Sequence, residues 1–178
     1  MEELKLVLPD VKYRDSFLSA IPEFRALEHK RWQDTAMAEM NENMLDAEFS
    51  DYIKNLYDRM NYPKPGTSRK FTYWLIDKDG WAGTIRIRPD LSKAQAENYG
   101  HIGFEIRPSK RGRGYSRQMI RMAMAESSKL GLSQVCLSCE NNNEPSKKTI
   151  ENTFNEYGGD GGHISETDYY CWINTIKK

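Results

Sequence analysis

The chain has 178 residues, and its 26 Lys and Arg residues balance 26 Asp and Glu residues, so the formal net charge at pH 7 is zero. This balance argues against a broad nucleic-acid or anionic-membrane surface, because both need an excess of basic residues. Hydrophobic residues make up 38% of the sequence, enough for one domain that folds alone. The sequence has neither a secretion-signal pattern nor an apolar run of bilayer-spanning length, so we expect a cytoplasmic protein.

The three cysteines are Cys136, Cys139 and Cys171. An odd number in a reducing compartment favours free thiols over a disulfide framework. Cys136 and Cys139 have the spacing of a metal-binding pair, but residues 134–139 have the composition of a strand, in which positions three apart point to opposite faces. We therefore expect buried or edge thiols and no metal site.

In the first half of the chain, the spacing of apolar residues predicts strands and helices in alternation. In chain order these are a strand over 4–8, a helix over 11–20, an amphipathic helix over 43–60, and two strands over 71–77 and 81–88. Asp10 can cap the first helix, and the prolines within 61–68 end the second. The pair Asp79-Gly80 between the two strands predicts a tight β-hairpin.

The second half of the chain continues this alternation. Its predicted elements are a strand over 100–107, a helix over 116–130, a strand over 134–139, a helix over 143–157 and a closing strand over 167–176. Residues 89–100 are polar and predicted to be irregular, and the glycine-rich residues 158–163 are predicted to form a turn. This order indicates an α/β domain with a mixed sheet.

Residues 107–116, with the sequence RPSKRGRGYS, are the densest motif of the chain. Gly112 and Gly114 let the backbone amides turn toward one point, and the predicted helix that follows adds its N-terminal amides and positive dipole end. Six basic residues surround this loop, namely Arg107, Lys110, Arg111, Arg113, Arg117 and Arg121. The arrangement is typical of a phosphate site, and a solvated basic turn is the alternative.

The segment from Arg111 to Ser116 resembles the Arg/Gln-x-x-Gly-x-Gly/Ala signature of the GNAT superfamily of N-acetyltransferases, with Ser at the last position. Residues 80–86, 100–108 and 143–146 are similar to family segments in the same order, and the most similar subgroup is the poorly characterised predicted acetyltransferases. The resemblance implies one acetyltransferase domain over residues 1–178. Its fold would be a GNAT-like α/β fold with a mixed, centrally splayed sheet flanked by helices.

The resemblance also implies that acetyl-CoA is the co-substrate and that its acetyl group passes to an amine of a small molecule or a protein. Loop amides would bind the pyrophosphate, and the pantetheine would lie between two splayed strands and pair with the backbone near Glu105. The residues that the resemblance places around acetyl-CoA are Ile106, Arg107, Arg111, Gly112, Arg113, Gly114, Tyr115, Ser116, Asn143 and Ser146. For Asn143 and Ser146, the alternative is a cap that opens the next helix.

Three residues are catalytic candidates. Glu105 lies on the strand that would border the acetyl group, where several family members carry a glutamate base, and His101 shares its face and titrates near neutrality. Ile150 occupies the place of the usual family acid, a tyrosine, so Tyr157 is the candidate substitute. A strand Glu or His is more often solvated or ion-paired than catalytic.

The roles of Arg86 and Arg88 and two alternative functions stay open at the level of the sequence. Arg86 and Arg88 share one face of a strand, where they would meet an acidic substrate, remain solvated or pair across strands. The absence of the usual tyrosine leaves a non-catalytic acyl-CoA-binding sensor or regulatory protein as one alternative, and a nucleotide-binding module as another. Family members often form homodimers, and we expect neither a nucleic-acid nor a membrane partner.

Overall fold

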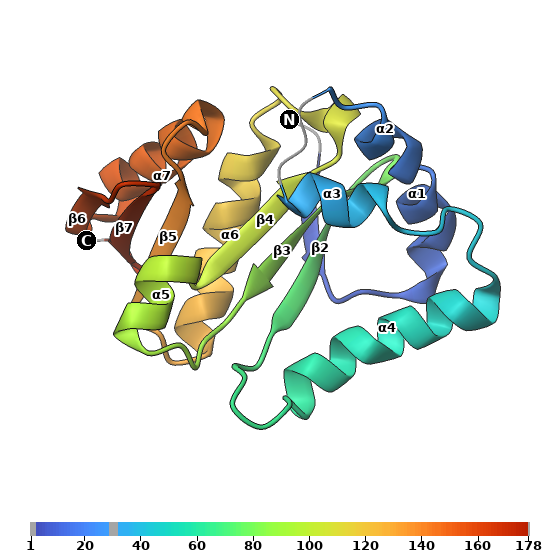
Figure 1. The fold of residues 1–178 in the computed structure, drawn as a ribbon, viewed down its shortest axis with the longest axis horizontal. Helices are drawn as coiled ribbons and strands as arrows, with labels where there is room; N and C mark the ends of the chain where they lie inside the picture. Colours follow the sequence, from blue (N-terminus) through green and yellow to red (C-terminus); the bar gives the residue numbers. More distant parts are fainter. Residues whose placement is uncertain (1–2, 29–31, 178) are drawn as a thin grey trace.

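A computed structural model describes residues 3–28 and 32–177. In these residues, seven strands form one sheet in the order β1-β2-β3-β4-β5-β7-β6 (Figure 1). The strands are β1 (Lys5–Val7), β2 (Phe71–Asp77), β3 (Gly80–Ile87), β4 (Ile102–Ile106), β5 (Gln134–Glu140), β6 (Gly159–Ile164) and β7 (Asp168–Asn174). Neighbouring strands are antiparallel except β4 and β5, which are parallel. The mixed α/β sheet expected from the sequence is confirmed.

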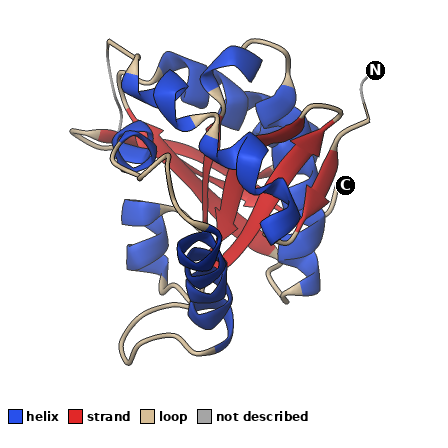
Figure 2. Cartoon of the chain, turned by 90° about the vertical axis from the view of Figure 1, so that its right-hand side faces the viewer, coloured by secondary structure: helices blue, strands red, loops and turns tan. Residues whose placement is uncertain are grey.

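Helices lie on both sides of this sheet (Figure 2). They are α1 (Arg14–Leu18), α2 (Ile21–Arg25), α3 (Trp32–Ala38), α4 (Asp46–Asn61), α5 (Lys93–Tyr99), α6 (Tyr115–Lys129) and α7 (Glu144–Tyr157), with short 3-10 turns η1 (Val11–Tyr13) and η2 (Pro108–Lys110). The expected hairpin is formed by β2 and β3, and the expected amphipathic helices correspond to α4, α6 and α7.

Two hydrophobic clusters hold the helices against the sheet. On one face, α6 and α7 pack onto the strands through fully buried side chains such as Met119 and Ile120. On the other face, α1, α2 and α4 surround Trp74 and Trp81, and Phe17 stacks on Trp74 with ring centroids 4.9 Å apart. Burying each large side chain of this kind stabilises the fold by about 1.5–3 kcal/mol.

The sheet opens between its two parallel strands. β4 and β5 share one register pair, Ile102 with Leu137, and then diverge, while β4 stays paired to β3 and β5 to β7. This divergence is the central splay that the GNAT resemblance implies. It exposes backbone groups inside the sheet, and such groups need partners from water or a ligand.

Two predictions about irregular segments are wrong. The segment 89–100 contains α5, because Ser92 and Gln95 form a reciprocal capping box at its start. The segment 158–163 contributes to the edge strand β6 instead of a turn. Glycine is needed there for close approach, since a Cβ at Gly162 would lie 2.3 Å from the hydroxyl of Tyr169.

The predicted first helix is also divided. The chain runs from η1 into α1, and a separate helix, α2, begins at Ile21 with Pro22 in its first turn. Proline suits a helix start because it has no amide hydrogen to donate. The expected cap is present, since the Asp10 side chain accepts a hydrogen bond from the amide of Lys12.

In the part of the chain that the structure describes, no helix is both long enough and apolar enough to cross a bilayer. The same residues contain no group of three or more His, Cys, Asp or Glu side chains that could hold a metal ion. Cys136, Cys139 and Cys171 are free, and Cys136 and Cys171 are buried.

Candidate active site

The loop between β4 and α6 turns through two glycines. Gly112 and Gly114 both have φ of +76°, a left-handed conformation that glycine adopts without strain, and Gly114 is the N-cap residue of α6. A Cβ added at either position would meet no heavy atom within 4 Å. The glycines therefore serve the backbone conformation, and the space in front of them is open.

The N-terminus of α6 carries backbone donors that the described part of the chain does not satisfy. No described residue accepts a hydrogen bond from the amides of Gly112, Arg113, Gly114 or Ser116, and α6 has no side-chain cap. Helix N-termini carry partial positive charge, and unbonded amides at such a point bind phosphate or other anions. The predicted phosphate loop therefore has the geometry of an anion site.

Most of the basic side chains around this loop are already paired. The ion pairs are Arg107 with Glu23 (2.6 Å), Lys110 with Asp77 (2.8 Å) and Asp79 (2.6 Å), Arg111 with Asp34 (2.6 Å), and both Arg117 (3.4 Å) and Arg121 (2.6 Å) with Glu156. The hydrogen bond from Arg121 is the largest reason why the pKa of Glu156 falls to about 2. These side chains hold the loop in place and leave anion binding mainly to the backbone.

Arg113 and Tyr115 differ in their placement within the loop. Arg113 is exposed, and no described acidic group lies within ion-pair distance of it. The Tyr115 side chain is buried, and its hydroxyl lies 3.0 Å from Oδ2 of Asp77. Of the residues predicted to bind the cofactor, Tyr115 can therefore contribute only its backbone.

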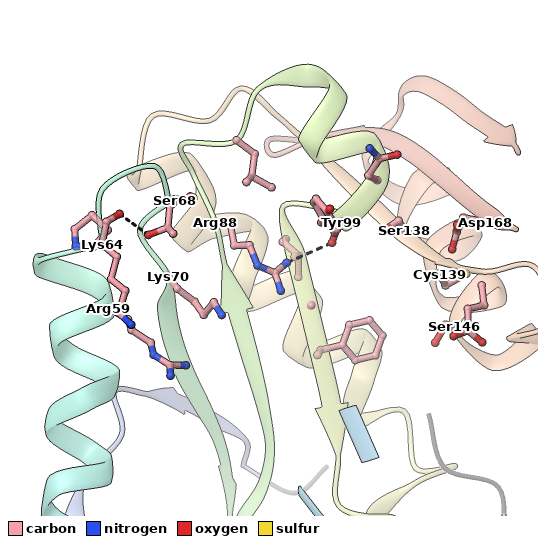
Figure 3. Close-up of a pocket in the computed structure, with 18 of the residues that line it drawn as sticks. Arg59, Lys64, Ser68, Lys70, Arg88, Tyr99, Ser138, Cys139, Ser146 and Asp168 are labelled. Atoms are coloured by element: carbon pink, nitrogen blue, oxygen red, sulfur yellow. Dashed lines mark hydrogen bonds between the residues drawn. The ribbon is translucent and has the colours of Figure 1, made fainter. Parts of the chain in front are cut away.

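A cavity of about 980 Å³ lies at the splay between β4 and β5 (Figure 3). Gly103 and Phe104 of β4 form one wall, and Ser138 and Cys139 of β5 lie across from them. The cavity extends past α5 to the C-terminal end of α4 and the segment 62–70. Its volume is at the upper end of the range of pockets that bind small molecules.

The pairing of β4 with β3 determines which backbone groups face the splay. The amide of Arg107 donates to the carbonyl of Ala82 (2.9 Å), and the amide of Arg88 donates to the carbonyl of His101 (2.8 Å). Because hydrogen-bonded residues alternate along an antiparallel pair, Phe104 and Ile106 direct their amides toward the side of β5. The strand backbone expected to pair with pantetheine is thus Phe104 and Ile106, and Glu105 points its backbone to β3.

Asn143 and Ser146 both line the cavity at the start of α7. Oδ1 of Asn143 accepts a hydrogen bond from the amide of Ser146 at 3.3 Å, so Asn143 caps α7. The capping alternative is therefore present in the structure, and it is compatible with contact to a ligand in the cavity.

Glu105, the predicted base, is buried in an ion pair and does not line the cavity. Its two carboxylate oxygens accept hydrogen bonds from Arg86 at 2.5 and 2.8 Å, and its side chain is 2% exposed. This cross-strand pair is the role that the sequence left open for Arg86. Tyr52 of α4 lies close to the pair, and burial is the main cause that raises the pKa of Tyr52 to about 12.

The other two catalytic candidates, like Glu105, do not line the cavity. His101 is 4% exposed, its Nδ1 accepts a hydrogen bond from the amide of Cys136 (2.9 Å), and burial followed by the charge of Arg88 lowers its pKa. Tyr157, the last residue of α7, is 7% exposed within the core cluster that α6 and α7 form with the sheet. His101 and Tyr157 are therefore placed as structural groups.

Sequence reasoning missed three cations of the cavity. Arg59 near the end of α4 and both Lys64 and Lys70 before β2 line it together with Arg88, which follows β3. Burial, then the charges of Arg88, Arg59 and Arg86, lower the pKa of Lys70 to about 8. The only sequence signal was the shared face of Arg86 and Arg88, since Arg59 and Lys70 lie in a helix end and a loop.

Solved structures similar to this chain include several acetyltransferases. The microcin C7 self-immunity acetyltransferase in complex with acetyl-CoA and AMP is 16% identical, with a TM-score of 0.68 over 98% of this chain and 93% of the other. The ribosomal-protein-S5-alanine acetyltransferase from Vibrio fischeri is 15% identical, with a TM-score of 0.64 over 100% and 97% of the two chains. A ribosomal L7/L12 α-N-protein acetyltransferase in complex with coenzyme A is 15% identical, with a TM-score of 0.61 over 98% and 94%. Identities this low show the fold.

No curated protein matches the sequence. The family described as "Acetyltransferase (GNAT) domain" matches residues 19–153, a range that contains the phosphate loop and both splayed strands. The family uses acetyl-CoA as its acetyl donor. With the fold, the open helix N-terminus and this match in agreement, the chain belongs to the GNAT acetyltransferases and is an acyltransferase.

Proposed function

We propose that this chain transfers the acetyl group of acetyl-CoA to a primary amine of a small molecule or a protein, by direct attack of the amine in a ternary complex. The observation that carries the proposal is the set of amides at the N-terminus of α6 that have no acceptor among residues 3–28 and 32–177, beside the strand that forms one wall of the splay. The three free cysteines support a cytoplasmic location, because reducing compartments maintain thiols.

The residues present fit acetyl-CoA. The open space in front of Gly112 and Gly114 and the free amides of the loop suit a pyrophosphate. Phe104 offers its backbone groups to the amides of the pantetheine arm, and Ile106 offers its amide, because its carbonyl already accepts a hydrogen bond from Nε of Arg111 at 3.0 Å. Phe104 and Asn143 both line the cavity. When bound, acetyl-CoA supplies a thioester carbonyl that an amine can attack, with release of the CoA thiol.

The chain's main contribution to this reaction is position. Holding the two reactants along β4 makes the reaction effectively intramolecular, which lowers barriers of this kind by up to about 7–11 kcal/mol. The free amide of Ile106 is the proposed donor to the thioester carbonyl oxygen. As the amine nitrogen bonds to the carbonyl carbon and the carbon–sulfur bond breaks, one amine proton must leave.

Glu105 is the proposed acceptor of that proton, provided that its ion pair with Arg86 opens. Both of its oxygens are bound to Arg86 and its side chain is closed off from the cavity, so binding of the acceptor has to open this pair. His101 and Tyr157 receive no catalytic role in the proposal. Nδ1 of His101 accepts a hydrogen bond from the amide of Cys136, and Tyr157 is buried in the core cluster of α6 and α7.

The phosphate loop can be tested with a matched pair of glycine variants. Gly114→Val and Gly131→Val introduce the same side chain at opposite ends of α6, at φ of +76° and +87°, and a Cβ meets no neighbour at either site. Both should destabilise the fold by about 1–3 kcal/mol through backbone strain. Only Gly114→Val should weaken CoA binding, by at least about tenfold, because its side chain covers the free amides.

Calorimetric titration with CoA and with acetyl-pantetheine, which lacks the pyrophosphate, measures this difference. We expect Gly114→Val to weaken the binding of CoA and to leave acetyl-pantetheine unchanged. Equal CoA affinity in the two variants would remove the loop from the proposed site. Tight CoA binding without CoA release in the presence of any amine would favour the acyl-CoA-sensor alternative over the enzyme.

A further inference from the structure

One end of the cavity gathers positive charge from three separate parts of the chain. Arg59 comes from α4, Lys70 from the segment before β2, and Arg88 from the end of β3. Figure 3 shows these side chains on the α4 side of the cavity, across from Ser138 and Ser146. The amide of Lys70 donates to the carbonyl of Arg59 (3.0 Å), so the loop and the helix end are tied together.

These cations have no carboxylate partner in the described part of the chain. No described acidic side chain lies within ion-pair distance of Arg59, Lys70 or Arg88. Asp58, the carboxylate that lines the same end, also forms no ion pair with them. The neighbouring Arg69, by contrast, has a carboxylate partner, because it forms an ion pair with Asp90 at 2.7 Å. The positive charge at this end of the cavity is therefore available to pair with an anionic ligand.

Arg88 is oriented by the backbone. Its Nη1 donates to the carbonyl of Gly100 at 3.0 Å and to that of Tyr99 at 3.3 Å. These contacts hold the guanidinium in place and leave its charge uncompensated. Gly103 lies beside it, where a Cβ would be 3.5 Å from Nη2 of Arg88, so the absence of a side chain keeps this part of β4 accessible.

The two ends of the cavity carry different charges, so each end suits a different ligand. The carboxylates of Glu140 and Asp168 and the polar start of α7 lie at the β5 end, where the proposed pantetheine site is. The cationic end lies on the far side of β4 and belongs to neither the phosphate loop nor the splay. It is the part of the cavity left for the acetyl acceptor.

We propose that the acceptor carries an anionic group, a carboxylate or a phosphate, in addition to its amine, and that Lys70, Arg88 and Arg59 bind this group. This inference rests on the proposed function and specifies its substrate class. A polyamine would bring positive charge to an end of the cavity that already carries Arg59, Lys64, Lys70 and Arg88, and such like-charge contact is unfavourable. The lowered pKa of Lys70 supports the inference, because an anion beside it would restore its ordinary value.

A series of short amines of matched length tests the proposal. With CoA present at saturating concentration, calorimetry would compare β-alanine and phosphoethanolamine, which are anionic, with ethanolamine and 1,3-diaminopropane. We expect the anionic members to bind at least about tenfold more tightly than the other two. The comparison of β-alanine with phosphoethanolamine identifies carboxylate or phosphate as the preferred group.

Substitutions at the cationic end test whether its residues cause the preference for amines that carry an anionic group. Lys70→Gln and Arg88→Gln should each weaken binding of the preferred anionic amine by about tenfold, and Lys70→Arg should preserve it. Lys54→Gln, on the exposed surface of α4 and outside the cavity, is the matched control and should change nothing. Equal binding of amines with and without the anionic group, or unchanged affinity in Lys70→Gln, would overturn the proposal.

Two controls keep this inference separate from the proposed function. Titration with CoA alone tests the phosphate loop, and its failure would remove the proposed function. If CoA binds normally and the amines show no preference for negative charge, the anionic acceptor is wrong and the acetyltransferase proposal stands. In turnover assays, Lys70→Gln should raise KM for the anionic amine and change kcat less than twofold, because Lys70 binds the acceptor without taking part in bond formation.

Discussion

The phosphate loop and the cationic end of the cavity both contain basic residues, but they use them differently. In the loop, Arg107, Lys110 and Arg111 are paired with carboxylates from α2, the β2–β3 hairpin and α3. At the cavity end, Lys70 and Arg88 have no described carboxylate partner. A dense basic motif can therefore be structural, while basic residues that are far apart in the sequence can gather into a binding site.

The physical reason is the environment that each group meets after folding. Loop residues pack against three other elements, and a paired charge between elements costs less than an unpaired one. At the cavity end, the neighbours of Lys70 are mostly cations, and its charge keeps access to water through the cavity. The two regions should therefore differ in how stability responds when a charge is removed.

The largest expected effect is at the buried pair. Glu105→Gln leaves Arg86 without a partner in a poorly solvated place, so the free energy of unfolding should fall by about 3 kcal/mol. Urea denaturation measures the change. The double variant Arg86→Met/Glu105→Leu should recover most of the loss, and a single variant as stable as the wild type would show that the pair is not structural.

Removing an uncompensated cation should have the opposite effect and should raise the free energy of unfolding. The pKa of Lys70 is about 8 in the folded protein and 10.5 in its unperturbed state, so folding penalises its charged form. Lys70→Met should raise the free energy of unfolding at pH 7 by about 1 kcal/mol, after allowance for solvent screening. Lower stability of Lys70→Met at pH 7 would contradict an uncompensated charge.

The pH dependence of that gain follows from the two pKa values. Below about pH 8 Lys70 is charged in both states and the whole penalty is present. Between pH 8 and 10.5 the unfolded chain binds more protons than the folded one, so wild-type stability rises relative to the variant. Urea denaturation at pH 7 and pH 10.5 should show the gain at the first value and its near absence at the second.

The smallest effect is expected at the exposed edge of the phosphate loop. Arg121→Gln removes a partner of Glu156, but the arginine is exposed and Lys177 remains 2.6 Å from the same carboxylate. The free energy of unfolding should change by less than about 1 kcal/mol. CoA affinity, measured by titration, should stay within about twofold of the wild type, and a tenfold loss would show that Arg121 binds the cofactor directly.

Periodic patterns predicted most of the elements, but they predicted neither the short helices α2 and α3 nor the structures of segments 89–100 and 158–163. The Asp79-Gly80 hairpin and the long helix α6 were predictable because turn residues and apolar spacing act within a few residues. The capping box at Ser92 was overlooked, so α5 was missed. The glycines of β6 look like a turn in sequence, and only their packing against β7 shows that they form a strand.

The sequence by itself determined the α/β alternation, the family resemblance and the loop whose glycines expose the amides of α6, because each depends on neighbours along the chain. Tertiary structure alone decided that Glu105 is bound to Arg86, that His101 supports β5, and that Arg59, Lys70 and Arg88 meet at one cavity. Electrostatic partners and burial depend on distance in space, and that distance is set by how β3, β4 and α4 pack, not by spacing in the sequence.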